Sequence, residues 1–517
     1  MRLGQLSSKA LLRIAILATA LAAQPIAGHR AAAAEEPAAV SMADSEKAYL
    51  AGDFKTAIDV LKVLAEKGDP VAQFRLGHML AEGKGEPQNL PLAAEWMQKA
   101  ADQGDTSALT FLGLFYLQGT GVKADLEKAA DLLKRAAEKG NAKAQLYIGQ
   151  MYQSGAGVEK NPVAGLTWIM SAARDGLAEA QFELGKIYAT GNGASKDPAE
   201  AEKWFIQAAE NNLLAAQYTL ASNYAQGTGV EKNEAKAFEW YRKAAEGGLI
   251  IAQRDLGGLY LTGPGAKPDY EQALKWSKRA AESGDAGAQS NLGYMYASGT
   301  GVKKDQKIAA EWYEKAAKGG LPRAQAALAF LYETGGGIEQ DDAKAANWYR
   351  RAAESGDKNA AAKLGEMFAS GRAEYSDETD AAIWIALAAE AGVTAGLDWL
   401  KQKAASGSAP AKARLAALYE SDDIAAGDAS EAIELFQAAA DAGDAFAQLR
   451  LGEKYATGNG VEQDYVIAHK WVNLAAIEGN GEAIKLRDTF AKLMTREQIA
   501  EAHRLAREWI SRSRAKE

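Results

Sequence analysis

The chain has 517 residues, of which 48% are hydrophobic and 25% charged, with 51 glycines, 11 prolines and no cysteine. Such a chain is too apolar to be disordered, and its abundance of alanine and other helix formers favours an all-α protein. The absence of cysteine excludes disulfides and thiol nucleophiles, and a formal charge of −9 argues against nucleic acid as a partner.

The first 34 residues have the pattern of an export signal. Basic residues precede an apolar run from Ile14 to Ala23, and an alanine tract offers a cleavage site near Ala34. An uncleaved membrane anchor would need about 20 continuous apolar residues, and this run is shorter. We therefore expect a signal peptide over residues 1–34 and a periplasmic or secreted mature chain without a transmembrane segment. Removing these residues, which hold four basic and no acidic side chains, changes the formal charge to −13.

Beyond this segment the sequence repeats with a period of 36 residues. Alanine recurs at one position of the period, usually followed by glutamine, and tryptophan recurs at a second position. The alanines are Ala72, Ala108, Ala144, Ala180, Ala216, Ala252, Ala288, Ala324 and Ala360; the tryptophans are Trp96, Trp168, Trp204, Trp240, Trp276, Trp312, Trp348 and Trp384, with Leu132 in the single gap. A register kept over so many units indicates tandem copies of one structural unit.

Each unit contains two amphipathic helical patterns joined by a glycine turn. In one unit, apolar side chains at helical spacing run from Ala180 to Tyr188 and again from Ala201 to Ala209. Between them, Gly191 can end the first helix in the left-handed conformation, and Asp197 followed by Pro198 is typical of an N-cap and first helical residue. The unit is therefore predicted to be a helical hairpin.

Glycine also recurs inside the first helix, where it costs about 1 kcal/mol relative to alanine. A recurring cost suggests a recurring need, so we expect a bulky Trp or Tyr of a neighbouring helix to pack against the bare backbone. Ala221 and Ala329 hold this position in two units, which indicates that only a small side chain is tolerated. The glycines are Gly113, Gly149, Gly185, Gly257, Gly293 and Gly365.

Departures from the period divide the chain into segments. Residues 35–68 lack the glycine loop and are expected to form an N-terminal lead and capping hairpin, followed by the regular array over residues 69–404. The phase then restarts after the loss of half a unit, which gives a shorter repeat segment over residues 405–485 and a joint near residues 404–410. That joint is equally compatible with a functional hinge and with a neutral deletion. Residues 486–517, with a Thr-x-x-Gln capping box, are expected to form a C-terminal capping helix.

The full repeat pattern, A-Q-x-x-L-G-x-x-Y-x-x-G-x-G-V followed by A-x-x-W-Y-x-K-A-A-x-x-G, is almost complete in residues 216–248 and 288–320. It resembles the Sel1-like repeat family, relatives of the tetratricopeptide repeats, over residues 45–485. The resemblance implies an α/α superhelical solenoid of about twelve 36-residue hairpins. It also implies an adaptor in a multiprotein assembly, in bacteria often an exported one that serves envelope signalling or polysaccharide secretion. It implies no reaction.

No arrangement of residues indicates catalysis, a cofactor or a metal. The four histidines, His29, His78, His469 and His503, have no ligand spacing, and the G-x-G turns lack the preceding strand and third glycine of a nucleotide-binding loop. We therefore expect no catalytic, cofactor-binding or metal-binding residue and a chain that is not an enzyme.

The best candidates for partner binding are the tyrosines that follow tryptophan in three units. Adjacent residues of a helix point about 100° apart, so we expect tryptophan to be buried and Tyr241, Tyr313 and Tyr349 to reach a groove. The leading interpretation is a non-catalytic exported adaptor that binds protein partners of the cell envelope through the concave face of the solenoid. The alternative is a peptidoglycan- or β-lactam-binding protein with weak β-lactamase-like hydrolase activity, like some cysteine-rich relatives. This chain lacks their cysteine pairs and has no S-x-x-K signature set.

Overall fold

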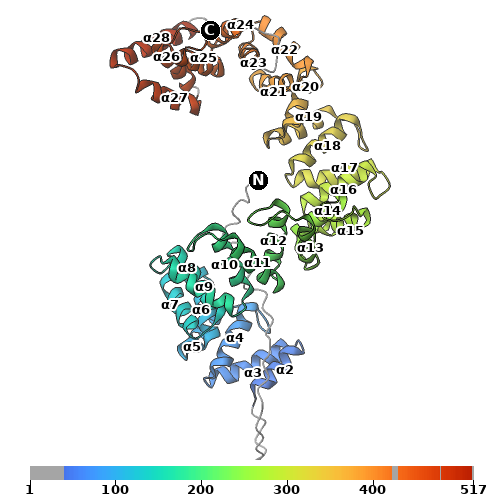
Figure 1. Ribbon diagram of the computed structural model, residues 1–517, viewed down its shortest axis with the longest axis vertical. Coiled ribbons are helices and arrows are strands. Elements are labelled where there is room, and N and C mark those ends of the chain that lie inside the picture. The colour runs from blue at the N-terminus through green and yellow to red at the C-terminus, as the bar shows by residue number, and fades with distance from the viewer. Residues whose placement is uncertain (1–39, 422–428, 478, 515–517) are drawn as a thin grey trace, which may run out of the picture. The chain divides into compact units, whose positions relative to one another are not determined.

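The computed structural model describes residues 40–421, 429–477 and 479–514, and every regular element in these ranges is an α-helix (Figure 1). This confirms the predicted all-α fold class. The segment expected to be a signal peptide lies outside the described residues. Within the described ranges, no helix is both long and apolar enough to cross a membrane. The chain divides into two compact units, residues 40–168 and 169–514, with the division inside helix α9.

The helices follow one another as hairpins along the first unit. They are α2 (Met42–Leu50), α3 (Phe54–Glu66), α4 (Pro70–Glu82), α5 (Leu90–Asp102), α6 (Thr106–Gln118), α7 (Leu126–Glu138), α8 (Ala142–Ser154) and α9 (Pro162–Arg174). The residues expected to form a capping hairpin thus contain α2 and α3, which are joined by a turn at Ala51–Gly52.

The same alternation continues through the second unit. Its helices are α10 (Ala178–Thr190), α11 (Pro198–Glu210), α12 (Leu214–Gln226), α13 (Glu234–Glu246), α14 (Ile250–Thr262), α15 (Tyr270–Glu282), α16 (Ala286–Ser298), α17 (Gln306–Lys318), α18 (Pro322–Thr334), α19 (Asp342–Glu354), α20 (Lys358–Ala369), α21 (Glu378–Glu390), α22 (Thr394–Ala405), α23 (Ala409–Glu420), α24 (Ala429–Asp441), α25 (Ala445–Thr457), α26 (Tyr465–Ile477), α27 (Gly481–Ala491) and α28 (Arg496–Arg514).

The ends of the helices are set by the residues that the sequence indicated. Helix α10 ends at Gly191, which has a φ of 79° and donates its N–H to the carbonyl of Ile187. The carboxylate of Asp197 caps α11 by accepting the amides of Ala199 and Glu200, each at 3.0 Å, and Pro198 occupies the first turn. Both predictions of cap residues are confirmed, and they explain where the turn of this hairpin begins and ends.

The recurring glutamine has a structural role that the sequence did not reveal. In eight repeats its side chain is buried, and its Nε2 donates to a backbone carbonyl at the end of the preceding helix over 3.0–3.4 Å. The donors are Gln73, Gln145, Gln181, Gln217, Gln253, Gln289, Gln325 and Gln448, and the acceptors are the carbonyls of Ala65, Ala137, Ala173, Ala209, Ala245, Ala281, Ala317 and Ala440. Each of these carbonyls also accepts a backbone N–H from the turn that follows its helix, so the glutamine adds a second hydrogen bond and ties one repeat to the previous one.

The glycine inside the first helix makes room for the second helix of its own repeat. A Cβ at Gly293 would lie 2.7 Å from the ring of Tyr313, and one at Gly185 would lie 2.7 Å from the ring of Phe205. At Gly365 the nearest atom is the carbonyl oxygen of Trp384, only 2.1 Å away. Close packing against these glycines is thus present, but of the three the expected Trp or Tyr ring is found only at Gly293. Gly113 faces Leu133 and Gly257 faces Ser277, so the prediction of a Trp or Tyr partner is wrong for most of these repeats.

The order of burial expected for the Trp-Tyr pairs is wrong. Tyr241, Tyr313 and Tyr349 are the buried members, because the position after tryptophan is the one that packs into the hairpin, whereas each tryptophan remains half-buried. A cation three residues later covers each exposed indole face. Lys243 lies 3.9 Å from the ring centroid of Trp240, Lys315 lies 4.0 Å from that of Trp312, and Arg351 lies 4.7 Å from that of Trp348.

Where half a unit is missing, two helices of similar character follow each other directly. Helix α22 and helix α23 are separated only by Ser406, Gly407 and Ser408, and Leu400 of the first and Leu415 of the second belong to one buried cluster. Residues 422–428, between α23 and α24, lie outside the described residues. The last helix, α28, begins with the predicted capping box, in which Gln498 N donates to Thr495 Oγ1 over 3.2 Å and Thr495 N donates to Gln498 Oε1 over 2.8 Å.

Helix α28 packs on α26 through two aromatic contacts. The ring centroids of Trp471 and Trp509 are 6.5 Å apart, and those of His469 and His503 are 5.4 Å apart.

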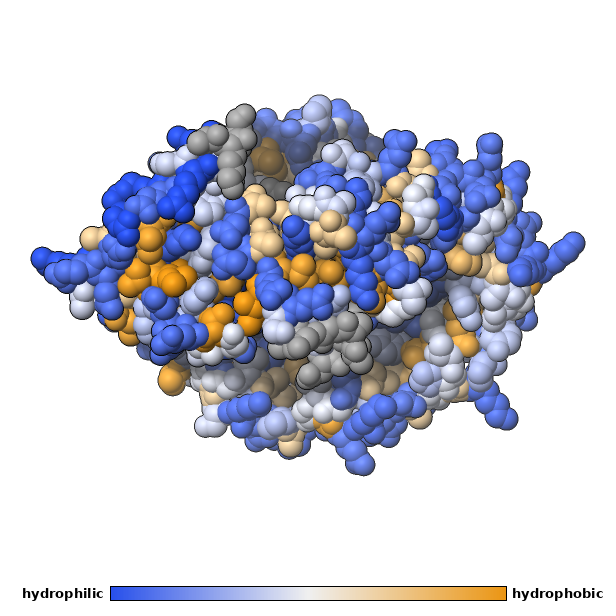
Figure 2. All heavy atoms as spheres, turned by 90° about the horizontal axis from the view of Figure 1, so that it is seen from above, coloured by the Kyte–Doolittle hydropathy of each residue, from blue (hydrophilic) through white to orange (hydrophobic). Residues whose placement is uncertain are grey.

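Figure 2 shows a face on which hydrophilic residues predominate and hydrophobic ones gather in limited groups. The exposed large apolar side chains of the C-terminal helices and their loops include Ile477 and Leu493.

Candidate binding groove

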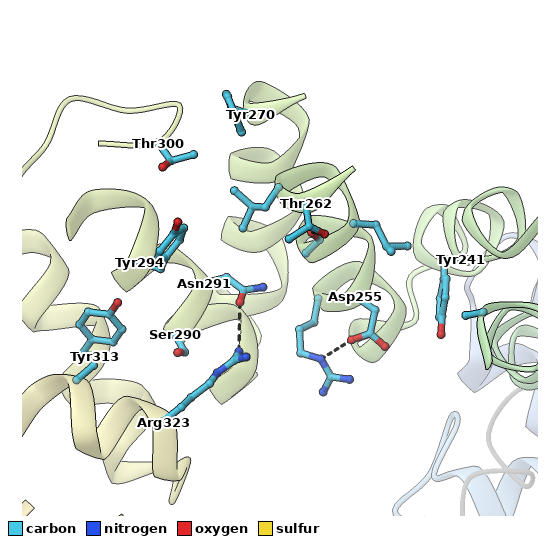
Figure 3. A pocket seen from close by; sticks show the side chains of 16 residues that line it. Tyr241, Asp255, Thr262, Tyr270, Ser290, Asn291, Tyr294, Thr300, Tyr313 and Arg323 are labelled. Carbon is cyan, nitrogen blue, oxygen red and sulfur yellow. Dashed lines mark hydrogen bonds and ion pairs between the residues drawn. The ribbon is translucent and has the colours of Figure 1, made fainter. Parts of the chain in front are cut away.

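A hollow of the second unit lies on the face that the first helices of three consecutive repeats form. Its volume is about 830 Å³, and its floor is made by α14, α16 and α18 (Figure 3). The residues that line it include Tyr241, Arg254, Asp255, Gly258, Asn291, Tyr294, Tyr313 and Arg323. This hollow is the candidate binding groove.

Two of the three tyrosines proposed from the sequence meet at this groove. Tyr241 and Tyr313 line it from α13 and α17, although each is only 8% exposed. Tyr349 lies in the next hairpin, is buried, and donates its hydroxyl to Glu333 Oε2 over 2.8 Å, so it does not line the groove. Burial raises the pKa of Tyr313 to about 12, even though the nearby Arg323 guanidinium acts to lower it. Tyr313 is therefore a neutral hydroxyl at the edge of the groove at physiological pH.

One side of the groove holds a closed set of charged and polar contacts. Arg254 Nε donates to Asp255 Oδ1 over 2.7 Å, and Arg254 Nη1 lies 3.5 Å from Asp285 Oδ2. The hydroxyl of Tyr218 donates to Asp255 Oδ2 over 2.8 Å. Burial, followed by the carboxylate of Asp255, raises the pKa of Tyr218. The charge of Arg254 is thus balanced by its own neighbours.

The other side presents a cation that has only neutral contacts. Arg323 Nη2 donates to the carbonyl of Gly287 and to Asn291 Oδ1, each over 3.2 Å, and no ion pair of Arg323 is present within the described part of the chain. Because Oδ1 of Asn291 accepts from Arg323, the amide nitrogen of Asn291 points the other way. Figure 3 shows Asn291 between Arg323 and Asp255. The groove therefore offers donors: the Asn291 amide and the remaining guanidinium N–H groups of Arg323.

A smaller hollow further along the chain differs from the groove because its arginines are already paired with carboxylates. It has a volume of about 460 Å³ and is lined by residues of α19, of α20 and of the loop after α20, including Arg350 and Arg372. Arg350 pairs with Asp380, and Arg372 pairs with Glu333 and Asp342 at 2.8 Å each. Both cations there are already neutralised, so this hollow has less to offer an anionic ligand than the groove beside Arg323.

Two exposed aromatic side chains on this face were missed by the sequence reasoning. Tyr294 of α16 and Phe330 of α18 are each 53% exposed and occupy the same position of successive repeats. In other repeats that position holds Ser222, Gly258 or Glu366. This position varies between repeats while the packing positions of the repeat stay the same. That difference could have indicated a groove position, because the packing of a repeat does not determine which residue stands there.

The groove does not have the composition of a catalytic or metal centre. Among the residues that the structure describes, no cluster of three or more His, Cys, Asp or Glu side chains could hold a metal ion. What the groove contains is a neutral hydroxyl, an oriented amide, an unpaired guanidinium and exposed aromatic rings, which is a set suited to recognition.

The match of the repeats to a family model shows which family the chain belongs to. The model of the Sel1 repeat matches residues 70–105, 106–141, 142–177, 178–213, 214–249, 250–285, 286–321, 322–357, 358–393, 409–444 and 445–480. The chain belongs to the Sel1 repeat family. The two runs of matches leave out the residues between 393 and 409, where half a unit is missing, and they confirm the predicted resemblance and the tandem-repeat solenoid.

Two of the solved structures to which this chain is similar are the following. A protective antigen of uropathogenic Escherichia coli strains, described as displaying an SLR fold, is 33% identical, with a TM-score of 0.57 and coverage of 88% of this chain and 94% of the antigen. A Sel1 repeat protein from Oxalobacter formigenes is 32% identical over 46% of this chain and 96% of its own, with a TM-score of 0.41. A comparison with curated proteins finds no match. Sel1 repeat proteins are generally non-catalytic and mediate protein–protein interactions.

Proposed function

We propose that this Sel1 repeat protein is an exported, non-catalytic adaptor that binds a protein partner of the cell envelope along the face formed by its first helices. The observation that carries the proposal is the groove on α14, α16 and α18, which combines exposed aromatic rings with unsatisfied donors. Aromatic and arginine side chains supply most of the binding energy in protein interfaces, so their gathering on one face of a repeat protein favours a protein ligand.

The expected export supports an envelope partner. A basic and apolar N-terminal segment with an alanine-rich cleavage site is typical of secreted proteins, and the absence of cysteine leaves the chain indifferent to the redox state outside the cytoplasm. The process served would be envelope signalling or the assembly of a polysaccharide or secretion apparatus.

Cross-linking in living cells tests the proposal. A C-terminally tagged chain carrying a photo-cross-linking residue in place of Phe330, which is exposed beside the groove, is irradiated and recovered from the fractionated envelope. The matched control places the same residue at Leu126, an exposed side chain at the start of the second helix α7 that does not line the groove. We expect one envelope protein to be cross-linked at Phe330 in near-stoichiometric yield, and a mature N-terminus near residue 35 by mass spectrometry.

Recovery of the tagged chain from the cytoplasm with residues 1–34 intact would contradict export. Recovery from the envelope with equal background at both positions would contradict an adaptor that binds through its first-helix face. The purified chain is expected to hydrolyse nitrocefin no faster than buffer, and turnover above that rate would contradict a non-catalytic role.

A further inference from the structure

Gly258 is a glycine that the packing of its repeat does not require. The other interior glycines of first helices, such as Gly257 and Gly293, would place a Cβ within 3.0 Å of a neighbouring helix. At Gly258 the nearest atom to a built Cβ is Asn291 Nδ2 at 3.9 Å, which is an ordinary contact distance. Alanine would fit there and would favour the helix by about 1 kcal/mol. The backbone at Gly258 is therefore left bare at a cost in stability that the fold does not explain.

The bare backbone forms part of the floor of the candidate binding groove. The equivalent position in the next two repeats holds the exposed rings of Tyr294 and Phe330. Because Gly258 has no side chain, a hollow remains above its backbone, next to the ring of Tyr294. A glycine in a helix allows another chain to approach the backbone closely. The hollow is thus shaped for something that lies against α14 and is held from the side by Tyr294.

The donors around the hollow define what that ligand must present. Asn291 Nδ2 faces Gly258, and its orientation is fixed because Oδ1 accepts from Arg323. An amide in this position can donate to a main-chain carbonyl of a peptide crossing the hollow. Acceptors on the same side are scarce, because both carboxylate oxygens of Asp255 are already bonded. A ligand that supplies acceptors is therefore favoured over one that supplies cations.

We infer that the groove binds an extended segment of a partner protein in which an acidic residue stands one or two positions from an apolar residue. The carboxylate pairs with Arg323, a main-chain carbonyl accepts from Asn291, and the apolar side chain fills the hollow over Gly258 against Tyr294. This inference rests on the proposed function, which it makes specific. Charge complementarity is local: Arg323 has no ion pair of its own, whereas Arg254 across the groove is balanced by Asp255 and Asp285.

Synthetic peptides test the inference without knowledge of the partner. Three helices spaced about 10 Å apart are crossed by an extended chain of about ten residues with ends to spare. Fluorescent peptides of that length carry Asp or Glu near Leu, Phe or Trp, and two further series replace the acid with Lys or the apolar residue with Ser. Binding to the full-length chain is measured by fluorescence anisotropy at about 0.15 M NaCl, beside an array of peptidoglycan fragments.

Three variants locate the site. Gly258→Leu fills the hollow, and Arg323→Gln removes the charge while keeping hydrogen-bonding capacity. The matched control is Lys186→Leu, which introduces leucine at the same position of an earlier repeat, on an exposed side chain outside the groove. We expect acidic-apolar peptides to bind the unmodified chain, Gly258→Leu and Arg323→Gln each to weaken binding about tenfold or more, and Lys186→Leu to leave it unchanged.

Four results would overturn the inference. They are binding that is insensitive to Gly258→Leu while circular dichroism shows an intact fold, a preference for the lysine series, binding of peptidoglycan fragments only, and binding of no peptide at all. Cross-linking in cells separates this failure from failure of the proposed function. If the envelope protein is still captured by the Gly258→Leu chain, the adaptor role stands and the site is elsewhere; if the unmodified chain captures nothing, the adaptor role fails independently.

Discussion

The close approach of two helices at Gly365 gives the sharpest prediction about stability. In the change Gly365→Ala, the new Cβ would lie 2.1 Å from the carbonyl oxygen of Trp384 and 2.9 Å from Cβ of Ala388, whereas ordinary contacts begin near 3.4 Å. Because the nearest atom belongs to the backbone, no side-chain rotation relieves the overlap, and α20 and α21 must move apart by more than 1 Å, the difference between those two distances.

The magnitude follows from two opposing contributions. Overpacking of a buried contact costs about 1–3 kcal/mol, and an overlap with backbone belongs at the upper end of that range. The gain in helix propensity returns about 1 kcal/mol. We therefore expect Gly365→Ala to destabilise its hairpin by about 2 kcal/mol. The matched variant Gly258→Ala has the same gain in propensity without the overlap and should stabilise its own helix by about 0.5–1 kcal/mol.

Hydrogen exchange read by mass spectrometry measures both effects locally, which suits a chain whose repeats contact mainly their neighbours. In Gly365→Ala, the amides of α20 and α21 should exchange about 30 times faster, while those of α14 and α15 are unchanged. Gly258→Ala should slow exchange in α14. If Gly365→Ala protects its hairpin as Gly258→Ala does, the glycine is not kept for packing and the reasoning is refuted.

Three further changes address the other recurring contacts. Gln253→Ala should cost about 0.5–1.5 kcal/mol in urea unfolding, because it removes a buried hydrogen bond between two repeats, whereas the exposed Gln226→Ala should cost almost nothing. Arg372→Gln should cost about 1 kcal/mol, mostly lost in high salt, because its two carboxylate partners remain partly exposed. His469→Leu should flatten the acid dependence of stability, since burial lowers the pKa of His469 to about 4, below the 6.5 of an unfolded chain.

The sign of the histidine effect follows from the two pKa values. Below pH 6.5 His469 binds a proton in the unfolded chain but not in the folded chain. The free energy of unfolding is therefore highest above pH 6.5 and decreases as the pH falls toward 4. Between about pH 8 and pH 5 the loss is about 2 kcal/mol, which His469→Leu should remove. Parallel pH profiles for the two proteins would contradict this account, as would equal costs for the two glutamine changes or an Arg372→Gln effect that salt leaves intact.

Much of the fold could be predicted from the sequence because the same helix-capping and turn residues recur in many repeats. The left-handed turn at Gly191, the cap at Asp197 and the capping box at Thr495 are local features, set by residues within four positions of one another, and all three were confirmed. The tandem-hairpin architecture follows from the same regularity.

The burial of the Trp-Tyr pairs could not be predicted from helical angles alone. Two adjacent residues differ by about 100°, and either could face the hairpin. For Tyr313 the contact is with Gly293 of the first helix, and in the units of Tyr241 and Tyr349 the equivalent small residues are Ala221 and Ala329. A comparison of units shows the signal: the position after tryptophan holds Phe205 or Tyr313 where the first helix has glycine, so large meets small at that position.

The groove was less predictable because its residues are those the repeat leaves free. Tyr294, Phe330 and Gly258 occupy one position with nothing in common, and Arg323 is outside the repeat pattern altogether. Only the arrangement of α14, α16 and α18 brings Gly258, Tyr294 and Arg323 to one hollow.

The glutamine bond between repeats also gives the chain a direction. The Nε2 of each Gln donates back to a carbonyl of the helix just before it, so the acceptor has already been synthesised when the glutamine is added to the chain. Contacts of such short sequence separation favour rapid folding. A growing chain of this kind can acquire structure one hairpin at a time from its N-terminal end, and a stalled or shortened chain would keep its earlier hairpins folded.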